Sequence, residues 1–195
     1  AARDLRPDAV DTVPVILQEL VRQPDLLLPF KNCFVTCGGA PLDLKSYEEL
    51  CRAGVDVVPH YGQTELGGGF CLVGAPRAGP DLMRPVKGIQ AFLLDDGDNN
   101  NNVAIPDSSE PIYGARRGEL VIIGRESMTT GYFGHEPFPS RRHRYTGDVF
   151  EVVDGGWLRH VCRKDDVIVL ASGELANPIP IEKIAIAHLP NVKRV

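Results

Sequence analysis

The sequence predicts an α/β fold, in which a parallel sheet with covering helices is followed by a β-rich, barrel-like part. Two apolar runs, residues 32–37 and 55–58, enclose a helical segment at 44–53, and strand–helix–strand is the order of a parallel βαβ unit. Beyond residue 70 the pattern changes, because short β-type runs alternate with glycine and proline turns, as in antiparallel strands. The fold class follows from these two patterns.

The chain opens with an amphipathic segment. Over residues 11–21, apolar side chains recur at the i, i+3, i+4 spacing of one helix face. Pro14 fits the first turn of such a helix, with Asp11 or Thr12 as its cap. We therefore expect a helix over 11–21 that ends before Pro24.

The β-rich part is predicted from short runs separated by turn residues. The expected strands are residues 89–94, 118–124, 149–153, 157–161 and 167–170. Asp154-Gly155-Gly156 has the composition of a hairpin turn, so an antiparallel sheet or a small barrel is expected. The Asp/Asn tract at 95–102 is too polar to bury a core, and we expect it to be an exposed loop without chemistry.

Three regions are expected along the chain. Residues 1–70 form a parallel α/β subdomain, and residues 71–164 form a β-rich subdomain. Residues 165–195 contain a hinge and the beginning of a small C-terminal domain, with helical spacing at 181–189. The sequence stops where a further strand would begin, so we expect a fragment of a longer protein.

Composition excludes several classes of function. With 43% hydrophobic and 24% charged residues, the 195-residue chain has the composition of a globular protein. The net charge of −5 does not favour a nucleic-acid partner, and no apolar run is long enough for a membrane span. The five cysteines are scattered and odd in number, which favours reduced thiols and a cytoplasmic protein. No signal peptide is found, although residue 1 is Ala.

The stretch from His60 to Gly69, HYGQTELGGG, is the strongest candidate for a binding site. It follows a predicted buried strand, and the carboxyl ends of parallel strands are where α/β sheets bind ligands. The hydroxyl of Thr64 can donate to a phosphate oxygen, and the carboxylate of Glu65 can hold Mg²⁺. A solvated turn, in which these two residues cap a following helix, explains the stretch equally well.

Five blocks taken together decide between these alternatives. They are Gly38–Leu42 (GGAPL), Tyr61–Glu65 (YGQTE), Gly118–Gly124 (GELVIIG), Tyr145–Asp148 (YTGD) and Arg163–Asp166 (RKDD). Their order and spacing resemble those of the adenylate-forming superfamily, which contains acyl-CoA synthetases, luciferases and the adenylation domains of non-ribosomal peptide synthetases. The resemblance implies that a carboxylic acid reacts with ATP to give an acyl-adenylate and pyrophosphate. Coenzyme A or the phosphopantetheine of a carrier-protein domain would then take the acyl group.

The resemblance also implies residues that bind the nucleoside. They are Gly38, Gly39, Ala40, Pro41, Tyr61, Gly62, Asp148 and Arg163. The residues from Gly38 to Pro41 would line the adenine side, and Tyr61 would stack on the base. Asp148 would accept hydrogen bonds from the ribose hydroxyls, and Arg163 would reach the same ribose. Without the resemblance, Asp148 could be a turn residue that bonds its own backbone, and Arg163 could belong to a surface ion-pair cluster.

The phosphate, metal and hinge positions follow in the same way. The resemblance implies that Thr64 contacts the α-phosphate, that Glu65 binds Mg²⁺, and that Asp165 is the hinge of the small domain. The phosphate-loop lysine and the C-terminal lysine of the family would lie outside these residues, so we expect this chain to be inactive alone. A non-catalytic nucleotide-binding or scaffolding module of the same fold remains the alternative.

Two features depart from the common pattern. Cys162 stands where the family usually has glycine, and residues 171–182 look more like the adenylate-forming reductase branch. The five histidines show no pairing pattern and are expected to be surface or core residues, although His60 lies where a wall of the acyl pocket could be. They are His60, His135, His143, His160 and His188.

Overall fold

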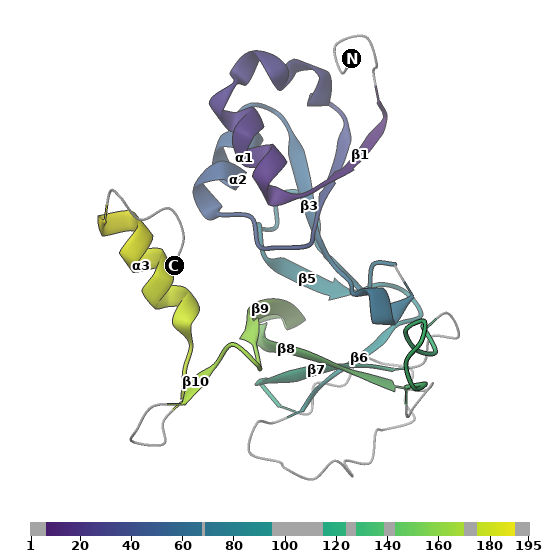
Figure 1. Cartoon of the computed structure of the whole chain (residues 1–195). Helices are drawn as coiled ribbons and strands as arrows, with labels where there is room; N and C mark the ends of the chain where they lie inside the picture. Colours follow the sequence, from purple (N-terminus) through teal and green to yellow (C-terminus); the bar gives the residue numbers. More distant parts are fainter. Residues whose placement is uncertain are drawn as a thin grey trace.

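The computed structural model describes most of the chain (Figure 1). The described residues are 7–67, 69–94, 115–123, 128–138, 143–169 and 175–189. The Asp/Asn tract at 95–102 that we expected to be an exposed loop lies outside them.

The first part of the chain is a three-stranded parallel sheet with two helices. Its elements are β1 (Ala9–Thr12), α1 (Pro14–Arg22), β2 (Phe34–Cys37), α2 (Leu44–Arg52) and β3 (Asp56–Tyr61). Strand β1 pairs with β2 and β2 pairs with β3, all in parallel, so the predicted βαβ unit is confirmed. The two helices lie on one side of the strands and pack against each other (Figure 1). Two short 3₁₀ turns, η1 (Pro24–Leu26) and η2 (Leu28–Phe30), connect α1 to β2.

The start of the predicted first helix was wrong. Asp11 and Thr12 do not cap a helix but belong to strand β1, where they pair with residues of β2. The Asp11 carboxylate accepts a hydrogen bond from the Thr36 hydroxyl at 2.6 Å, so its side chain serves the sheet. Helix α1 starts at Pro14 without a side-chain cap. Helix α2, in contrast, has a side-chain cap, because the Asp43 carboxylate accepts from the Ser46 N–H at 2.8 Å.

The second part continues the same sheet with antiparallel strands. They are β4 (Leu72–Val73), β5 (Leu82–Pro85), β6 (Gln90–Leu94), β7 (Arg117–Ile123), β8 (His143–Val153) and β9 (Trp157–Arg163). The order across the nine strands is β1-β2-β3-β4-β5-β9-β8-β7-β6, so β1 and β6 are the two edges among the described residues. The antiparallel prediction is therefore confirmed. Because β3 pairs with β4 across residue 70, the sheet is continuous at the first predicted boundary, and the boundaries at 70 and 164 remain predictions.

Strand β8 is longer than its sequence suggested. We expected a strand over 149–153, but β8 begins at His143, so the Thr-Gly-Asp motif lies inside the strand. Gly147 adopts a positive φ of 71°, and the pairing with β9 shifts register between Val149 and Phe150. These two irregularities interrupt the alternation of inward and outward side chains that identifies a strand in a sequence.

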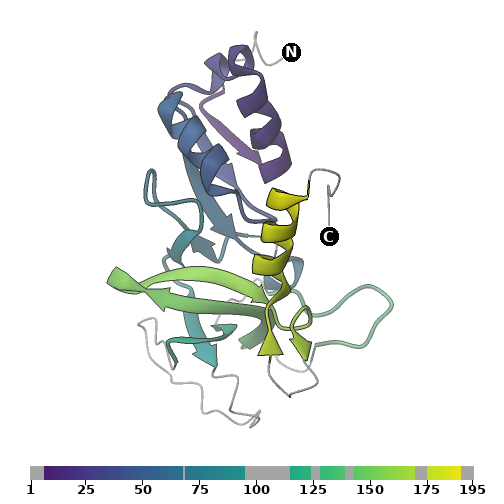
Figure 2. The ribbon, with the colours of Figure 1, turned by 90° about the vertical axis from the view of Figure 1, so that its left-hand side faces the viewer.

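The β8–β9 hairpin is closed by the predicted turn. A short 3₁₀ turn, η4 (Asp154–Gly156), brings Val153 opposite Trp157. The Arg84 guanidinium of β5 lies 4.2 Å from the centre of the Trp157 ring and donates to the Gly155 carbonyl at 2.5 Å. This contact fastens the hairpin to β5. Figure 2 shows the hairpin crossing the molecule below α1 and α2.

The antiparallel part has its own core of buried apolar side chains. Its fully buried side chains include Leu66, Leu72, Leu93, Leu120, Ile122, Phe150 and Leu158. After β9 the chain forms a two-stranded sheet, β10 (Ile168–Val169) and β11 (Leu175–Ala176), and then helix α3 (Pro178–His188). The Asn177 side chain caps α3 by accepting from the Ile179 N–H at 3.0 Å. Among the described residues, no helix is long and apolar enough to cross a membrane.

Candidate functional site

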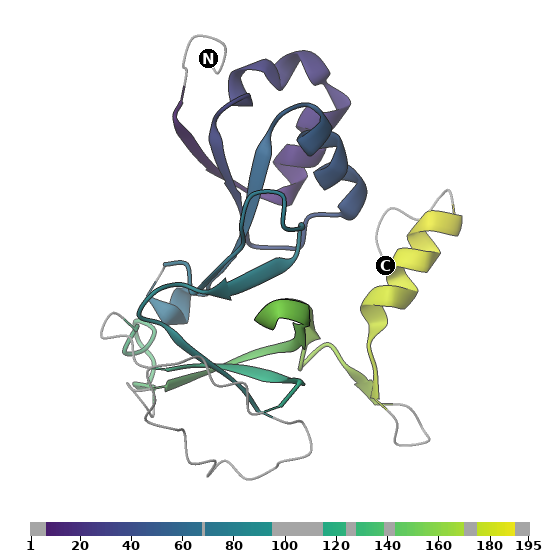
Figure 3. The ribbon, with the colours of Figure 1, turned by 180° about the vertical axis from the view of Figure 1, so that it is seen from behind.

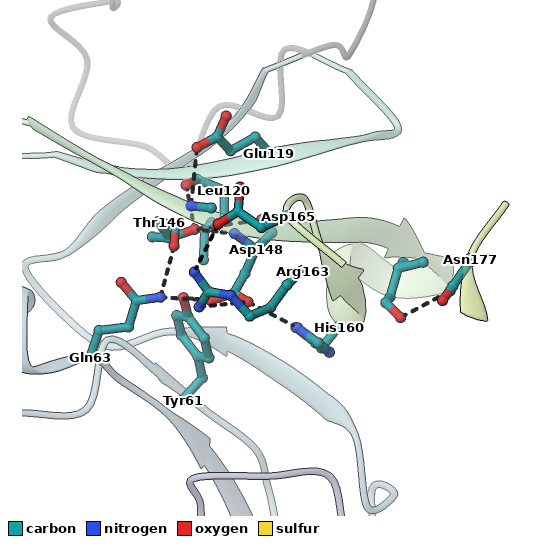
Figure 4. A network of polar contacts seen from close by, with 12 residues as sticks. Tyr61, Gln63, Glu119, Leu120, Thr146, Asp148, His160, Arg163, Asp165 and Asn177 are labelled. Carbon is teal, nitrogen blue, oxygen red and sulfur yellow. Dashed lines mark hydrogen bonds and ion pairs between the residues drawn. The ribbon is translucent and has the colours of Figure 1, made fainter. Parts of the chain in front are cut away.

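A network of polar side chains joins the end of β3 to strands β8 and β9 (Figure 4). At its centre is Asp148 of β8, which is only 4% exposed. Tyr61 stands at the end of β3, and Gln63 follows it in the loop that leads to η3 (Thr64–Leu66). His160 and Arg163 come from β9, whose pairing with β8 brings them to the same carboxylate.

Both oxygens of the Asp148 carboxylate are in contact with protein donors. Oδ2 accepts from the Tyr61 hydroxyl at 2.7 Å and from the Gln63 side-chain amide at 2.6 Å. Oδ1 lies 3.3 Å from His160 Nε2 and 3.6 Å from the Arg163 guanidinium. The two contacts to Oδ1 are longer than those to Oδ2, and the Arg163 side chain is 47% exposed. Oδ1 is therefore held by longer contacts than Oδ2, and one of them comes from a side chain that is half exposed.

The surroundings of Asp148 favour its ionised form. Burial opposes ionisation, but the donors His160 and Tyr61 and the nearby Arg163 outweigh it and hold the pKa of Asp148 below its usual value. Burial and the Asp148 carboxylate together raise the pKa of Tyr61, so its phenol stays protonated as a donor. The site thus presents a fixed, buried anion.

A second carboxylate, that of Glu119, is hydrogen-bonded to the backbone just before Asp148. Glu119 of β7 is 7% exposed, and it accepts from the Gly147 N–H at 3.1 Å. Its other oxygen accepts from the Lys164 ammonium at 3.1 Å, and the Lys164 N–H donates to the Gly147 carbonyl at 2.7 Å. Gly147 needs its glycine here, because φ is positive and a Cβ would come within 3.1 Å of Arg163. Glu119 and Lys164 therefore fix the backbone that positions Asp148.

Thr64 and Glu65 form the single turn η3 rather than the start of a helix. The turn ends at Gly67, which has a positive φ of 86°. Gln63 ties this loop to β8, because its amide also donates to the Thr146 carbonyl at 2.9 Å. The Glu65 carboxylate accepts a hydrogen bond from the Tyr132 hydroxyl. The predicted phosphate and metal residues thus lie on a loop held against the strand that carries Asp148.

The glycine-rich turn after β2 meets β3 through His60. A Cβ at Gly38 would lie 2.2 Å from the His60 ring, so only glycine fits. His60 Nε2 lies 3.0 Å from the Asp11 carboxylate, and its ring lies 3.9 Å from that of Phe70. This contact places the turn beside the residue that precedes Tyr61.

The structure brings together some of the predicted residues and leaves others apart. Tyr61, Asp148 and Arg163 meet directly in the network. Asp165 lies at the rim, where its carboxylate is 83% exposed and 3.8 Å from Arg163. The ion-pair alternative for Arg163 is thus partly realised. The turn alternative for Asp148 is not, because its carboxylate contacts side chains from β3, the following loop and β9.

Four residues that we did not single out take part in the arrangement. They are Gln63, Glu119, Tyr132 and His160. His60 and His160, which we expected to be surface or core residues, each face an aspartate. The hairpin turn predicts a register that brings His160 near Asp148, and that signal could have identified it.

The polar side chains of the site can be compared with the ligands that they would bind. A buried carboxylate and an exposed guanidinium suit a sugar with vicinal hydroxyls. Among the described residues, no cluster of three or more His, Cys, Asp or Glu could hold a metal ion by itself. Glu65 offers a single carboxylate, which suits Mg²⁺ that is bound mainly by phosphates and water.

Comparison with known proteins identifies the family. A family model described as AMP-binding enzyme matches residues 1–133, more than half of the 195 residues. The chain belongs to the AMP-binding enzyme family. The resemblance inferred from the five sequence blocks is confirmed at this level.

Relatives of this AMP-binding chain are much longer than it is. An adenylate-forming reductase of Aspergillus terreus is 29% identical, and the match covers 93% of this chain but 15% of the reductase. An anthranilate–CoA ligase of Pseudomonas aeruginosa is 27% identical over 96% of this chain and 35% of the ligase. Because a reductase and a ligase match at similar identity, the reductase branch is only weakly indicated.

Solved structures show the same fold. O-succinylbenzoate coenzyme A synthetase of Bacillus subtilis, in complex with ATP and magnesium ion, superimposes with a TM-score of 0.71 at 21% identity. The match covers all of this chain and 40% of that one. The nine-stranded mixed sheet of this AMP-binding chain is therefore part of the fold of adenylate-forming enzymes.

Proposed function

We propose that this chain supplies the AMP and magnesium side of a site that activates a carboxylic acid with ATP. The carboxylate oxygen attacks the α-phosphorus, the bond to the pyrophosphate oxygen breaks, and acyl-adenylate and pyrophosphate form. A thiol of coenzyme A or of a carrier-protein pantetheine then attacks the acyl carbon, and AMP leaves. The observation that carries the proposal is the buried Asp148 carboxylate, held ionised beside the half-exposed Arg163.

The proposal gives each residue a role. Asp148 accepts from the ribose hydroxyls through Oδ1, and Arg163 turns from Asp148 to the same sugar. Tyr61 keeps its hydroxyl on Asp148 while its ring offers a flat surface to adenine. Thr64 would donate to the α-phosphate, and Glu65 would hold the Mg²⁺ that arrives with the triphosphate, a cation that would reduce the repulsion between two anionic reactants.

The remaining predicted roles belong to the same proposal. Gly38, Gly39, Ala40 and Pro41 line the adenine side, together with Gly62. The exposed Asp165 is the hinge after β9, next to the Glu119–Lys164 pair. That the 195 residues alone do not turn over is part of the same proposal.

ATP–pyrophosphate exchange by the full-length protein, over a panel of carboxylic acids, tests the proposal. Asp148→Ala should lower exchange roughly 5- to 150-fold, since losing a buried hydrogen-bond partner costs about 1–3 kcal/mol. Asp25→Ala, at an exposed position of η1, is the matched control and should behave as wild type. Nucleotide binding without exchange for any acid would instead support a non-catalytic nucleotide-binding module. An Asp148→Ala protein with wild-type exchange would refute the ribose role.

A further inference from the structure

The segment between β7 and β8 lies against the turn that carries Thr64 and Glu65 (Figures 1 and 3). This segment, residues 128–138, makes three hydrogen bonds to the turn. The Thr129 N–H donates to the Glu65 carbonyl at 3.2 Å, and the Thr129 hydroxyl donates to the Thr64 carbonyl at 2.9 Å. The third bond runs from the Tyr132 hydroxyl to Oε1 of Glu65. The first two hold the backbone, and the third holds the functional carboxylate.

The segment is anchored independently of these bonds. Met128 is 6% exposed and belongs to the same core cluster as Leu66 of η3. Arg144 of β8 donates to the Thr129 carbonyl at 3.0 Å, and its guanidinium lies 3.9 Å from the centre of the Phe138 ring. Both ends of the segment are therefore fastened, which gives the Tyr132 hydroxyl a defined position.

Tyr132 itself is held by ring contacts rather than by burial. Its side chain is 48% exposed, and its ring meets the rings of Phe138 and His135 edge to face. The Tyr132 hydroxyl donates to the Glu65 carboxylate from this position. Because the hydroxyl is not needed to fill the core, phenylalanine at position 132 can keep the ring contacts and remove only the bond to Glu65.

A positively charged side chain lies near the Glu65 carboxylate that accepts this bond. Arg144 is 7% exposed, and its positive charge lies near the Glu65 carboxylate. A carboxylate can accept at both oxygens, so a hydroxyl on Oε1 orients the group without using Oε2. Carboxylates that bind metal ions are commonly oriented by such hydrogen bonds, and losing one typically lowers metal affinity about 10- to 100-fold.

We propose that Tyr132 is a positioning residue for the divalent cation, which it serves by orienting the Glu65 carboxylate. The proposal rests on the proposed function, because it takes Glu65 as the residue that meets the cation. It adds that the 128–138 segment is part of the phosphate side of the site. Tyr132 itself touches neither the nucleotide nor the acid in this role.

The test compares Tyr132→Phe with wild type in the full-length protein. Mn²⁺ binding is followed by electron paramagnetic resonance in the presence of α,β-methylene-ATP, and AMP binding is measured by calorimetry in EDTA. For Tyr132→Phe we expect Mn²⁺ affinity to fall about 10- to 100-fold, while metal-free AMP affinity stays within about twofold. The Mg²⁺ concentration for half-maximal exchange should rise by the same factor, with the rate recovering at saturating Mg²⁺. Phe133→Leu, at the fully exposed neighbouring residue, is the matched control.

The outcomes separate this inference from the function on which it rests. Unchanged Mn²⁺ affinity in Tyr132→Phe would overturn the positioning role and leave adenylation intact. Equal losses of Mn²⁺ and metal-free AMP binding would also overturn it, since they indicate a general disturbance of the site. Wild-type protein that binds no Mn²⁺ with the nucleotide would refute both.

Discussion

Replacing Glu119 should reveal how strongly the Gly147 turn depends on one buried acceptor. Glu119→Leu removes the acceptor of the Gly147 N–H and the partner of Lys164, while keeping a side chain of similar size. Glu119→Gln keeps a carbonyl oxygen for the Gly147 N–H and loses only the charge. The two variants therefore separate the hydrogen bond from the ion pair.

The expected losses in the free energy of unfolding follow from how exposed the Glu119 and Lys164 side chains are. The Glu119 side chain is 10% exposed, so an unpaired N–H beside it should cost about 1–3 kcal/mol of the free energy of unfolding. The Lys164 side chain is 51% exposed and can return to water, so the lost ion pair should cost less than about 1 kcal/mol. We expect about 2 kcal/mol for Glu119→Leu and under about 1 kcal/mol for Glu119→Gln.

Urea unfolding, with midpoints compared at constant slope, measures these differences. AMP affinity should fall in the same order, because Gly147 precedes Asp148 in β8. Lys164→Met removes the same ion pair but leaves the buried Glu119 carboxylate without its cation, so its loss should exceed that of Glu119→Gln. Equal losses for glutamine and leucine would show that the charge matters and the hydrogen bond does not. That result would refute the reasoning.

Three further predictions concern the same framework. The pKa of Asp148 is lowered in the folded protein, so wild type should be more stable than Asp148→Asn. This advantage should be complete above about pH 4 and should disappear as the pH falls through the lowered pKa. Urea unfolding measured against pH can check it. Gly38→Ala should destabilise the protein by about 1–3 kcal/mol in thermal unfolding, because the added Cβ would meet the His60 ring. Adding His60→Ala should restore much of this loss. Additive effects of the two substitutions would contradict the prediction. Phe150→Ala should cost about 3–5 kcal/mol, since Phe150 is fully buried, and a loss under about 1 kcal/mol would show that the core is assigned wrongly.

Much of the fold could be predicted from periodicity. The βαβ unit around α2 and the β8–β9 hairpin were correct because each combines an uninterrupted pattern with a clear cap or turn, at Asp43 and at Asp154–Gly156. Strand β1 was missed because Asp11 and Thr12 are polar residues next to a helix, and their role depends on Thr36 in β2. A long-range pairing of this kind leaves no local signal.

The candidate site was predictable in its motifs and less so in its connections. Tyr61, Asp148 and Arg163 stood out because each belongs to a recognisable block, and the structure brings them together. Glu119 and Tyr132 act on neighbours 28 and 67 positions away, so only the folded chain shows what they hold. The roles of all these residues toward a nucleotide remain predictions that the variants above can test.

The contact between Arg84 and Trp157 gives the molecule a built-in optical reporter. Trp157 is the single tryptophan of the chain, and a guanidinium 4.2 Å from its ring sets the polarity that its fluorescence senses. It stands at the start of β9, the strand that also carries His160 and Arg163. A shift of that strand relative to β5 should therefore change the emission of the native protein without any added label.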